Sequence, residues 1–390
     1  MSEWKKVRLG EVAYYVMDRS EVMGLALENY ISTENMLPDK GGVSLASSVP
    51  SYGSVTEFCH GDVLVSNIRP YFKKIWKATR DGFCSNDILV LRCKDCICCD
   101  FLFFALSNDA FFDYVMASAK GTKMPRGDKQ QILEYSLSIP PLPTQRKIAA
   151  VLGALDDKIE NNRKICANLE AQAQAIFKSW FVDFEPFGGK MPQGWKMGKL
   201  GDVAECNPYR ALKKGVKARC VEMADLVTSA SFPASWSYKE YSGGMKFANG
   251  DTIIARITPC FENGKAAYVN FLEEGEVAFG STEYVVMASR SVVPPELFYC
   301  VAKDPDFISF AKSRMVGSSG RQRFSAEDIA MYPIAIAPDE VYLEVQPLLH
   351  SFMDQARMLG FESRALAAMR DALLPKLMSG EIDVEKVEVA

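Results

Sequence analysis

The sequence contains an internal repeat. Residues 4–13 recur as residues 195–204 with six of ten positions identical, including Trp4 with Trp195 and Gly10 with Gly201. Four further matches follow in the same order, at offsets between 189 and 197 residues. Because chance does not produce five matches in one register, the repeat predicts two copies of one unit, an α/β domain followed by a long helix. A chain of 390 residues has room for both copies.

The later matches define the parts of each copy. Residues 61–70 match 250–259, residues 83–91 match 279–287, the loop 121–126 matches 317–323, and the segment from Thr144 matches the segment from Val341. Alternating or β-branched apolar residues predict strands at 62–68, 87–92, 251–257 and 283–288. Helical spacing covers 101–117 and 297–312. The phenylalanines of the first of these helical segments fit core packing better than a base-stacking platform.

Two long segments have a different period. Apolar residues recur at alternating intervals of four and three, which is typical of a coiled coil, with Asn162 as the break in the first segment and Gln355 and Glu362 as polar interruptions in the second. The apolar positions are Leu152, Leu155, Ile159, Cys166, Leu169, Ala173 and Ile176, and Leu348, Phe352, Leu359, Leu366, Met369 and Leu373. We expect the first helix to start with Thr144 as its cap and to reach about Phe181, a length of about 57 Å. In the second helix, Pro347 suits the first turn and Pro375 the end.

The two seams predict that these helices pair. The chain must run out along one helix and back along the other, so the simplest arrangement is an antiparallel spacer with one domain at each end. Matching the helix midpoints places Asn162 near Leu359 and Glu362. We hypothesise that these polar residues meet and fix the register. A solvent-exposed polar break, or a contact with another subunit, is the alternative for Asn162.

The composition gives no support for catalysis, metal binding or membrane insertion. The formal charge is −4, and the two histidines, His60 and His350, have no obvious local partner. Phosphate loops, dinucleotide fingerprints and methyltransferase motifs do not occur, so we expect no catalytic residues on this chain. The cysteine run 93–99 favours reduced thiols over zinc. Without an apolar segment long enough for a bilayer or a signal-peptide core, the sequence predicts a cytoplasmic protein with no membrane contact.

Basic residues cluster although each domain is nearly neutral. Residues 1–143 carry 16 basic and 17 acidic groups, and residues 195–340 carry 17 and 18. Clusters at matching positions in both copies fit phosphate and base contacts with DNA better than the alternative, solvated loops. The DNA-binding candidates are Arg69, Tyr71, Lys73, Lys74, Lys77, Lys123 and Arg126 in the first copy, and Arg210, Lys213, Lys214, Lys217, Arg256, Arg321 and Arg323 in the second.

Five stretches along the chain resemble one known family. Residues 140–162, 177–186, 192–195, 200–204 and 373–382 resemble the specificity subunit of type I restriction-modification systems. The resemblance implies two target-recognition domains, each reading one half of a split double-stranded DNA site, and two antiparallel helices that dock two methylation subunits. It also implies restriction subunits as partners, and S-adenosylmethionine, ATP and Mg²⁺ on the partner subunits, with no cofactor on this chain. Residues 338–346 depart from the family's Pro-Pro-x-x-Gln pattern, so the start of the second helix is less well defined.

Repeat, period and resemblance together predict an α+β fold. Two repeated mixed α/β target-recognition domains are separated by two long antiparallel coiled-coil helices, with pseudo-two-fold symmetry. The expected parts are an N-terminal target-recognition domain at 1–143, a first spacer helix at 144–184, a C-terminal target-recognition domain at 185–340, a second spacer helix at 341–379 and a tail at 380–390. A spacer longer than one turn of DNA, about 34 Å, suits a bipartite site with an unread gap.

The leading hypothesis is a non-catalytic DNA-specificity subunit that recruits partners for adenine N6 methylation or ATP-dependent cleavage. One alternative is a protein-only scaffold with two interaction domains and no DNA specificity. Salt-sensitive DNA binding by the assembled complex distinguishes the two. Another alternative is a single-chain nuclease or methyltransferase. Incubating the purified chain with DNA, S-adenosylmethionine and magnesium tests that alternative.

Overall fold

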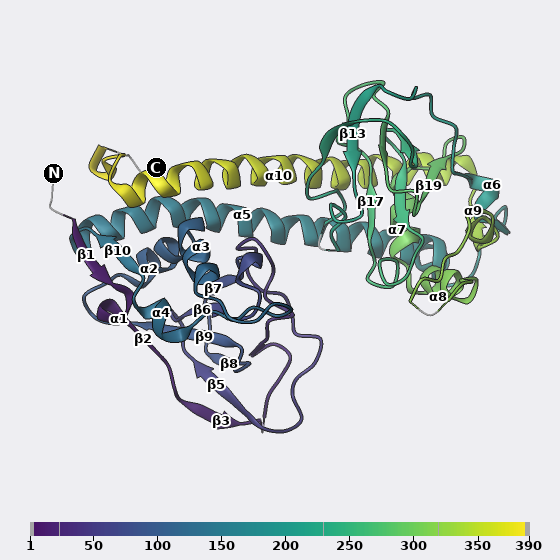
Figure 1. The fold of residues 1–390 in the computed structure, drawn as a ribbon. Helices are drawn as coiled ribbons and strands as arrows, with labels where there is room; N and C mark the ends of the chain where they lie inside the picture. Colours follow the sequence, from purple (N-terminus) through teal and green to yellow (C-terminus); the bar gives the residue numbers. More distant parts are fainter. Residues whose placement is uncertain (1–3, 23, 229, 319, 387–390) are drawn as a thin grey trace. The chain divides into compact units, whose positions relative to one another are not determined.

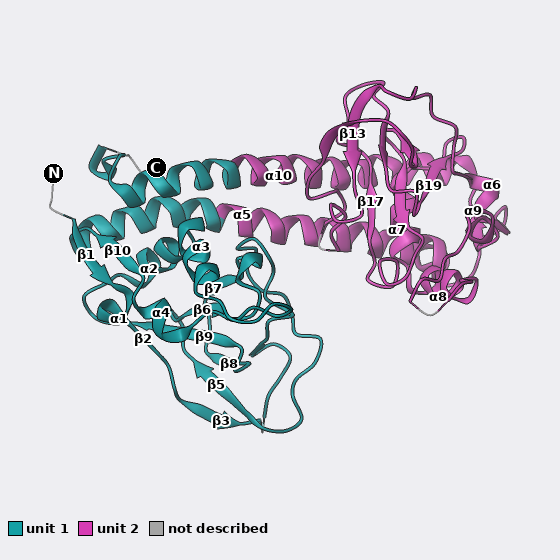
Figure 2. Ribbon diagram, viewed as in Figure 1, with its two compact units in different colours: residues 1–157, 366–390 teal, residues 158–365 magenta. Residues whose placement is uncertain are grey.

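The computed structural model describes residues 4–22, 24–228, 230–318 and 320–386 (Figure 1). The chain divides into two compact units. Unit 1 comprises Met1–Asp157 with Leu366–Ala390, and unit 2 comprises Lys158–Ala365 (Figure 2). Two long helices, α5 (Leu142–Phe177) and α10 (Asp339–Ser379), each contribute one segment to unit 1 and one to unit 2.

Each unit holds one copy of the repeat, with the strands of its first sheet and its helices in the same order. Besides its segments of α5 and α10, unit 1 contains β1 (Lys5–Arg8), α1 (Leu9–Val12), β2 (Ala13–Tyr15), β3 (Arg19–Glu21), β4 (Tyr30–Ile31), β5 (Ser54–Phe58), β6 (Val63–Ser66), η1 (Pro70–Phe72), β7 (Ile75–Lys77), β8 (Gly82–Cys84), β9 (Ile88–Cys93), α2 (Cys99–Leu106), α3 (Asp109–Ala117), α4 (Lys129–Leu133), β10 (Ser136–Ile139) and η4 (Val384–Lys386).

Unit 2 repeats this order after the end of α5. It contains the π-helical turn η2 (Lys178–Val182), η3 (Glu185–Phe187), β11 (Lys196–Lys199), α6 (Leu200–Val203), β12 (Ala204–Cys206), β13 (Lys217–Val221), β14 (Ser237–Glu240), β15 (Lys246–Phe247), β16 (Thr252–Ala255), β17 (Ala266–Tyr268), β18 (Ala278–Gly280), β19 (Tyr284–Ser289), α7 (Glu296–Lys303), α8 (Pro305–Ser313), α9 (Ala326–Ala330) and β20 (Pro333–Ile336).

The first sheet has the same topology in both units. Its order is β2-β9-β6-β7 in unit 1 and β12-β19-β16-β17 in unit 2, with every neighbouring pair antiparallel. A separate two-stranded ladder joins β1 to β10 and β11 to β20. The repeat detected in the sequence is therefore a repeat of structure.

Both faces of the first sheet are covered, which explains why its central strands are almost wholly apolar. Because side chains alternate along a strand, Val63 and Val65 of β6 pack with the helices, whereas Leu64 packs with the second sheet. In β16 of unit 2, Ile254 faces the helices and Ile253 faces the second sheet. Each domain thus has a layer of helices, a first sheet and a second sheet.

The second sheet differs between the units at one edge. In unit 1, β8 pairs with β4 in parallel and with β5 antiparallel. In unit 2, β18 likewise pairs with β13 in parallel and with β15 antiparallel. The fourth strand then joins opposite edges, because β3 pairs with β5 but β14 pairs with β13. The sequence matches contain no sign of this difference.

Two predicted helices are interrupted. The segment 101–117 forms α2 and α3, and the segment 297–312 falls into α7 and α8. Asn108 starts α3 by accepting a hydrogen bond from the amide of Ala110, and Asp304 does the same for α8 with the amides of Asp306 and Phe307. The phenylalanines of the first segment lie in the core, as predicted, with Phe101 and Phe111 fully buried.

The boundaries of the long helices also differ from the prediction. The helix α5 starts at Leu142, so Thr144 lies in its first turn and is not its cap. The helix α10 starts at Asp339 and ends at Ser379, so Pro347 and Pro375 both lie inside it. Each proline removes one backbone hydrogen bond. Apolar burial next to each proline, at Val345 and Leu349 and at Leu374 and Leu377, sustains the helix.

Within each unit the segments of α5 and α10 run antiparallel. In unit 1, Asp156 pairs with Arg370, and Leu152 lies in one core with Leu374 and Leu377. In unit 2, the side-chain amide of Asn162 donates to Glu362 Oε2 at 2.7 Å, and the Cys166 thiol donates to the carbonyl of Ala356 at 3.5 Å. The predicted meeting of Asn162 and Glu362 is confirmed.

The aromatic residues that follow α5 belong to the core of unit 2. Phe181 stacks on Tyr342 with the ring centroids 5.7 Å apart, and its centroid lies 5.6 Å from that of Trp195. Trp180 and Phe184 pack against the same core. Packing within unit 2 therefore accounts for this aromatic cluster.

Candidate nucleic-acid interface

The same loop folds back onto the first sheet in each unit. In unit 1 it lies between α3 and α4, where Arg126 forms backbone bridges with Lys120 and with Ile68, which follows β6. In unit 2, Arg323 forms the corresponding bridges with Val316 and with Ile257, which follows β16. The loop is thus closed on itself and fixed to the end of a buried strand, and it holds one arginine at a matched position in both copies.

A carboxylate binds this arginine in both units. Arg126 lies 2.9 Å from Asp87 Oδ1, and Arg323 pairs with Glu283 at 2.8 Å. Asp87 and Glu283 occupy matching positions directly before β9 and β19. The Arg323 guanidinium, aided by Arg256, lowers the pKa of Glu283 against the opposing effect of burial. Because the unfolded pKa is the higher one, this pairing stabilises the fold at neutral pH and is lost as the pH falls through the lowered value.

The two copies differ next to this ion pair. Where unit 2 has Arg256, whose guanidinium lies 3.3 Å from Glu283, unit 1 has Asn67, whose buried Oδ1 has no hydrogen-bond partner in the described part of the chain. Where unit 2 has Thr258, unit 1 has Arg69, whose buried Nε also has no partner within those ranges. Both backbone amides are nevertheless held alike, Arg69 by the carbonyl of Pro125 and Thr258 by that of Gln322. The backbone scaffold around the loop is therefore the same in both units, whereas the polar side chains on it differ.

Four other predicted DNA-binding residues are engaged within the fold. Lys73 pairs with Asp109 at 2.9 Å and lowers the pKa of that carboxyl. The ammonium of Lys74 donates a hydrogen bond to the carbonyl of Thr33, and burial lowers the pKa of Lys74. Lys77 pairs with Asp100. These three cations already have protein partners in unit 1, which reduces what they can offer to phosphate.

Arg210 is the fourth engaged residue, and its role is structural. It forms two hydrogen bonds to Asp251, at 2.6 and 3.1 Å, and only 1% of the Asp251 side chain is exposed. In unit 1 the matching Asp62 is paired in the same way with Arg92, which comes from β9 instead. Both aspartates also accept a backbone hydrogen bond that shapes the turn before the strand, from Cys59 and Ala248 respectively.

The remaining predicted residues have exposed polar or cationic groups. Within the described ranges, no ion pair involves the exposed side chains of Lys123, Lys213, Lys214, Lys217 and Arg321. Tyr71 is 48% exposed and rests on Phe72, with the ring centroids 4.6 Å apart. Lys123 and Arg126 share one loop, as do Arg321 and Arg323. Lys213 and Lys214 lie elsewhere, on the segment before β13, and Lys217 is the first residue of that strand.

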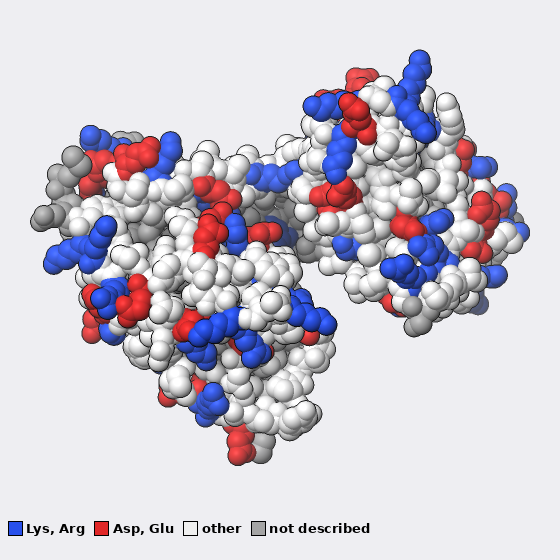
Figure 3. All heavy atoms as spheres, in the orientation of Figure 1, with Lys and Arg blue, Asp and Glu red and all other residues white. Residues whose placement is uncertain are grey.

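Acidic and basic groups are interspersed on the visible face of each unit, as Figure 3 shows. The sequence identified the arginines of the two loops but missed Asp87 and Glu283, which hold them. A signal was present, because the matched stretches 83–91 and 279–287 place a carboxylate at the same point in both copies.

Across the described ranges, no group of three or more His, Cys, Asp or Glu side chains is arranged to hold a metal ion. None of the helices in those ranges is both long enough and apolar enough to cross a membrane.

Comparisons with known proteins agree on one family. Residues 1–171 match the type I restriction modification DNA specificity domain. The chain is 26% identical over 328 residues to the specificity subunit of the type I restriction enzyme MjaIX from Methanocaldococcus jannaschii, covering 75% of this chain and 71% of that protein. It is 24% identical over 461 residues to the HindI specificity subunit from Haemophilus influenzae, covering 98% and 100%.

A solved structure has the same fold. The crystal structure of the S subunit of a type I restriction-modification system from M. genitalium aligns over 96% of both chains, with a TM-score of 0.55 and 16% identity. At that identity the likeness concerns the fold alone.

Proposed function

The chain belongs to the specificity subunits of type I restriction-modification systems, and from this membership we propose that it reads a bipartite double-stranded DNA site, one half with each unit. The observation that carries the proposal is the matched loop, which presents an arginine at the same place in each copy, Arg126 and Arg323. A common scaffold with different polar groups around it suits two domains that perform the same task on different sequences.

We further propose that the chain carries specificity and assembly but no catalysis. Two methylation subunits would dock on it and supply S-adenosylmethionine chemistry, the N6 methylation of adenine. Restriction subunits would supply ATP-dependent cleavage, with Mg²⁺ as a cofactor of the partner subunits. This division of labour follows from family membership, and it agrees with a sequence in which no catalytic motif occurs.

Within the candidate set, the structure favours some residues over others as DNA contacts. The exposed cations Lys123, Lys213, Lys214, Lys217 and Arg321 are the best candidates for phosphate. Arg69, Arg126, Arg256 and Arg323 lie at the matched loop, where arginine can read guanine once the loop meets a groove. Lys73, Lys74, Lys77 and Arg210 are weaker candidates for phosphate because each already has a partner within the protein. Arg126, Arg256 and Arg323 are paired as well, and they remain candidates for base contacts because of their place at the matched loop.

The direct test is to map modified adenines across the host genome with and without this gene. The expected result is a set of N6-methylated sites that depends on the gene and has two defined halves separated by an unread gap. A genome in which methylation does not change would contradict the proposal. The map would also identify both half-sites and the gap length in one experiment.

Two further experiments separate the proposal from its alternatives. Replacing Arg126 with Ala should relax recognition of one half-site only, at a cost of about 1–3 kcal/mol for a base contact. An equal loss for every DNA sequence would assign Arg126 to phosphate. The assembled complex should bind DNA in a salt-sensitive manner, and the absence of such binding would favour a protein-only scaffold.

A further inference from the structure

One pair of matching carboxylates has different partners in the two units. In unit 1, Asp100 at the start of α2 pairs with Lys77 on β7. The matching carboxylate in unit 2 is Glu296 at the start of α7, displaced by the same 196 residues that separate Asp87 from Glu283. The residue that matches Lys77 is Tyr268, because Lys77 pairs with Val63 across the sheet as Tyr268 pairs with Thr252. Unit 2 therefore keeps the carboxylate and lacks the lysine.

Glu296 is left with one oxygen unsatisfied. Its side chain is 1% exposed, and its Oε1 accepts a hydrogen bond from the Tyr268 hydroxyl at 3.1 Å and lies 3.0 Å from His350 Nδ1. Its Oε2 is buried and has no hydrogen-bond partner among the residues that the structure describes. Burial, together with Glu296, raises the pKa of Tyr268, so the tyrosine stays a neutral donor. A buried carboxylate with an unpaired oxygen costs free energy, which a cation would recover.

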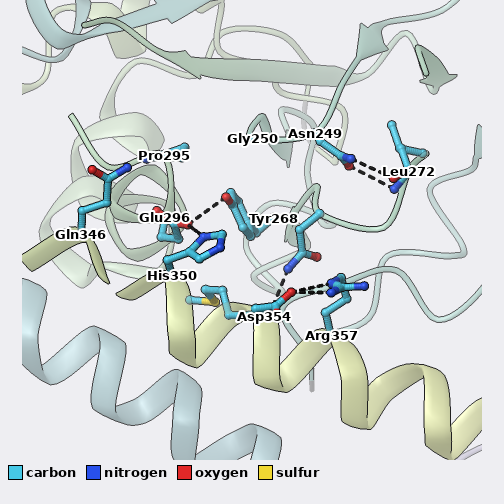
Figure 4. Close-up of a pocket in the computed structure, with 12 residues that line it drawn as sticks. Asn249, Gly250, Tyr268, Leu272, Pro295, Glu296, Gln346, His350, Asp354 and Arg357 are labelled. Atoms are coloured by element: carbon cyan, nitrogen blue, oxygen red, sulfur yellow. Dashed lines mark hydrogen bonds and ion pairs between the residues drawn. The ribbon is translucent and has the colours of Figure 1, made fainter. Parts of the chain in front are cut away.

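A cavity of about 560 Å³ adjoins Glu296 within unit 2 (Figure 4). Its lining includes Glu296 and Tyr268 from the domain and His350, Asp354 and Arg357 from α10. Asp354 pairs with Arg357, so Glu296 is the carboxylate in this lining that has no cation from Lys or Arg. The volume lies within the range of small-ligand sites in proteins.

His350, on α10, contacts the buried Glu296. Its side chain is 70% exposed, and a change of rotamer at such a surface position is fast. Offset by 197 residues, as Arg126 is from Arg323, His350 matches Gly153 in α5. An added Cβ at Gly153 would meet nothing within 4 Å. The imidazole is therefore specific to unit 2, like the missing lysine and the unpaired oxygen.

We propose that this cavity binds a protonated amine or a guanidinium, with Glu296 as its counterion, in the role that Lys77 plays for Asp100 in unit 1. The cation is either a free polyamine or a lysine or arginine side chain of a partner protein, since both present the same chemistry. The site is separate from the proposed DNA-reading loops, and the inference does not depend on DNA binding by this chain.

Binding is tested on the full chain with spermidine and methylguanidinium as probes, by calorimetric titration at constant ionic strength. The expected result is one saturable site per chain for at least one of the two probes. Glu296→Gln should weaken binding about tenfold or more, because a hydrogen bond to a charged group contributes about 1.5–3 kcal/mol. Tyr268→Lys, which restores the arrangement of unit 1, should also abolish binding while keeping the fold intact. Asp100→Asn is the matched control in unit 1 and should leave the affinity unchanged.

A second arm identifies the source of the cation. If a partner side chain fills the cavity, assembly with the methylation subunits should block probe binding, and Glu296→Gln and Tyr268→Lys should both weaken assembly. If the ligand is a free amine, the assembled complex should still bind the probe. The proposal is overturned if neither probe binds the wild-type chain and neither variant weakens assembly. It is also overturned if Asp100→Asn reduces probe affinity as much as Glu296→Gln.

Discussion

At the scale of single residues, the two carboxylates that hold the loop arginines are central. Asp87 holds one arginine and Glu283 holds two, Arg256 and Arg323. Each carboxylate fixes the direction of a guanidinium and neutralises its charge. We therefore expect these acidic residues to favour specific over non-specific DNA binding, by keeping the arginines unavailable to any phosphate that comes near.

Removing these carboxylates should convert specific contacts into non-specific ones. In the assembled complex, Asp87→Asn should relax only the half-site read by unit 1, and Glu283→Gln only the half-site read by unit 2. Because each new phosphate contact steepens the dependence of log K on log salt by about 0.9, Asp87→Asn should add about one such contact and Glu283→Gln about two. Methylation maps and binding at several salt concentrations measure both effects.

The unchanged half-site serves as an internal control in each of these variants. Asp95→Asn removes the same charge from an exposed aspartate of unit 1 that has no ion pair in the described part of the chain, and should change neither the half-sites nor the salt slope. Equal effects of Asp95→Asn and Asp87→Asn would mean that net charge, not the held arginine, is responsible.

Arg210 should matter for stability rather than recognition. Its removal leaves Asp251, which is almost fully buried, without a counterion. Breaking such a pair costs about 3–5 kcal/mol when both partners are deeply buried. Because Arg210 is partly exposed, we expect Arg210→Ala to destabilise unit 2 by about 2–3 kcal/mol, measured by urea unfolding. The exposed Lys214→Ala should change stability by less than about 0.5 kcal/mol, and a similar loss in both variants would refute the assignment.

At the scale of elements, the paired helices depend on one buried polar residue. Asn162 is 0% exposed, and its amide nitrogen donates to Glu362 and Ser363, while its Oδ1 has no partner among the described residues. Glu362 stays partly exposed and also lies 3.5 Å from Lys158. Stability alone would favour an apolar residue at this position, so the function that suits Asn162 is to specify the register.

Asn162→Leu should therefore raise the thermal stability and permit alternative registers. Register is measured by disulfide formation between Cys166 and Ala356→Cys, since the Cys166 thiol already contacts the carbonyl of Ala356. When Asn162→Leu is added, this native crosslink should become less efficient, and a cysteine placed one heptad away at Ser363 should begin to form one. The adjacent, exposed Asn161→Leu is the matched control. Unchanged melting temperature and crosslinking in Asn162→Leu would exclude a register function.

Some features of the helices and strands follow from the local sequence, and others do not. The repeat, the apolar strands and the coiled-coil period were sufficient to predict two α/β copies and an antiparallel helix pair. The helix interruptions at Asn108 and Asp304 had a local signal, because both residues are good caps. The continuation of α10 through Pro347 and Pro375 had no local signal, because tertiary burial overrides the preference of proline for helix ends.

The candidate site follows the same division. Clusters of lysine and arginine are visible in the sequence, but whether each cation is free depends on a partner far along the chain. Arg210 pairs with Asp251, which lies 41 positions away in the sequence, and Arg126 pairs with Asp87, at a separation of 39 positions. The opposite edge strands of the second sheets, β3 and β14, likewise arise from pairings between distant segments.

At the scale of the whole molecule, the net charge of −4 is unevenly distributed along the chain. Residues 1–143 carry a net −1, residues 144–194 a net +1, residues 195–340 a net −1 and residues 341–390 a net −3. Several of the lysines and arginines in the predicted clusters are further neutralised by ion pairs within their own unit. Six of the candidate lysines and arginines are already paired with carboxylates, which reduces the phosphate contacts that the predicted clusters can offer to DNA.

We accordingly expect the isolated chain to bind DNA weakly and the assembled complex to bind it tightly. Methylation subunits would then supply most of the phosphate contacts, and this chain would supply the sequence preference. Fluorescence anisotropy with a DNA that contains both half-sites, measured with and without the partners over a range of salt, tests this. The complex should show a much steeper salt slope than the chain alone. Tight, salt-insensitive binding by the isolated chain would contradict this expectation, because binding through phosphate contacts weakens as the salt concentration rises.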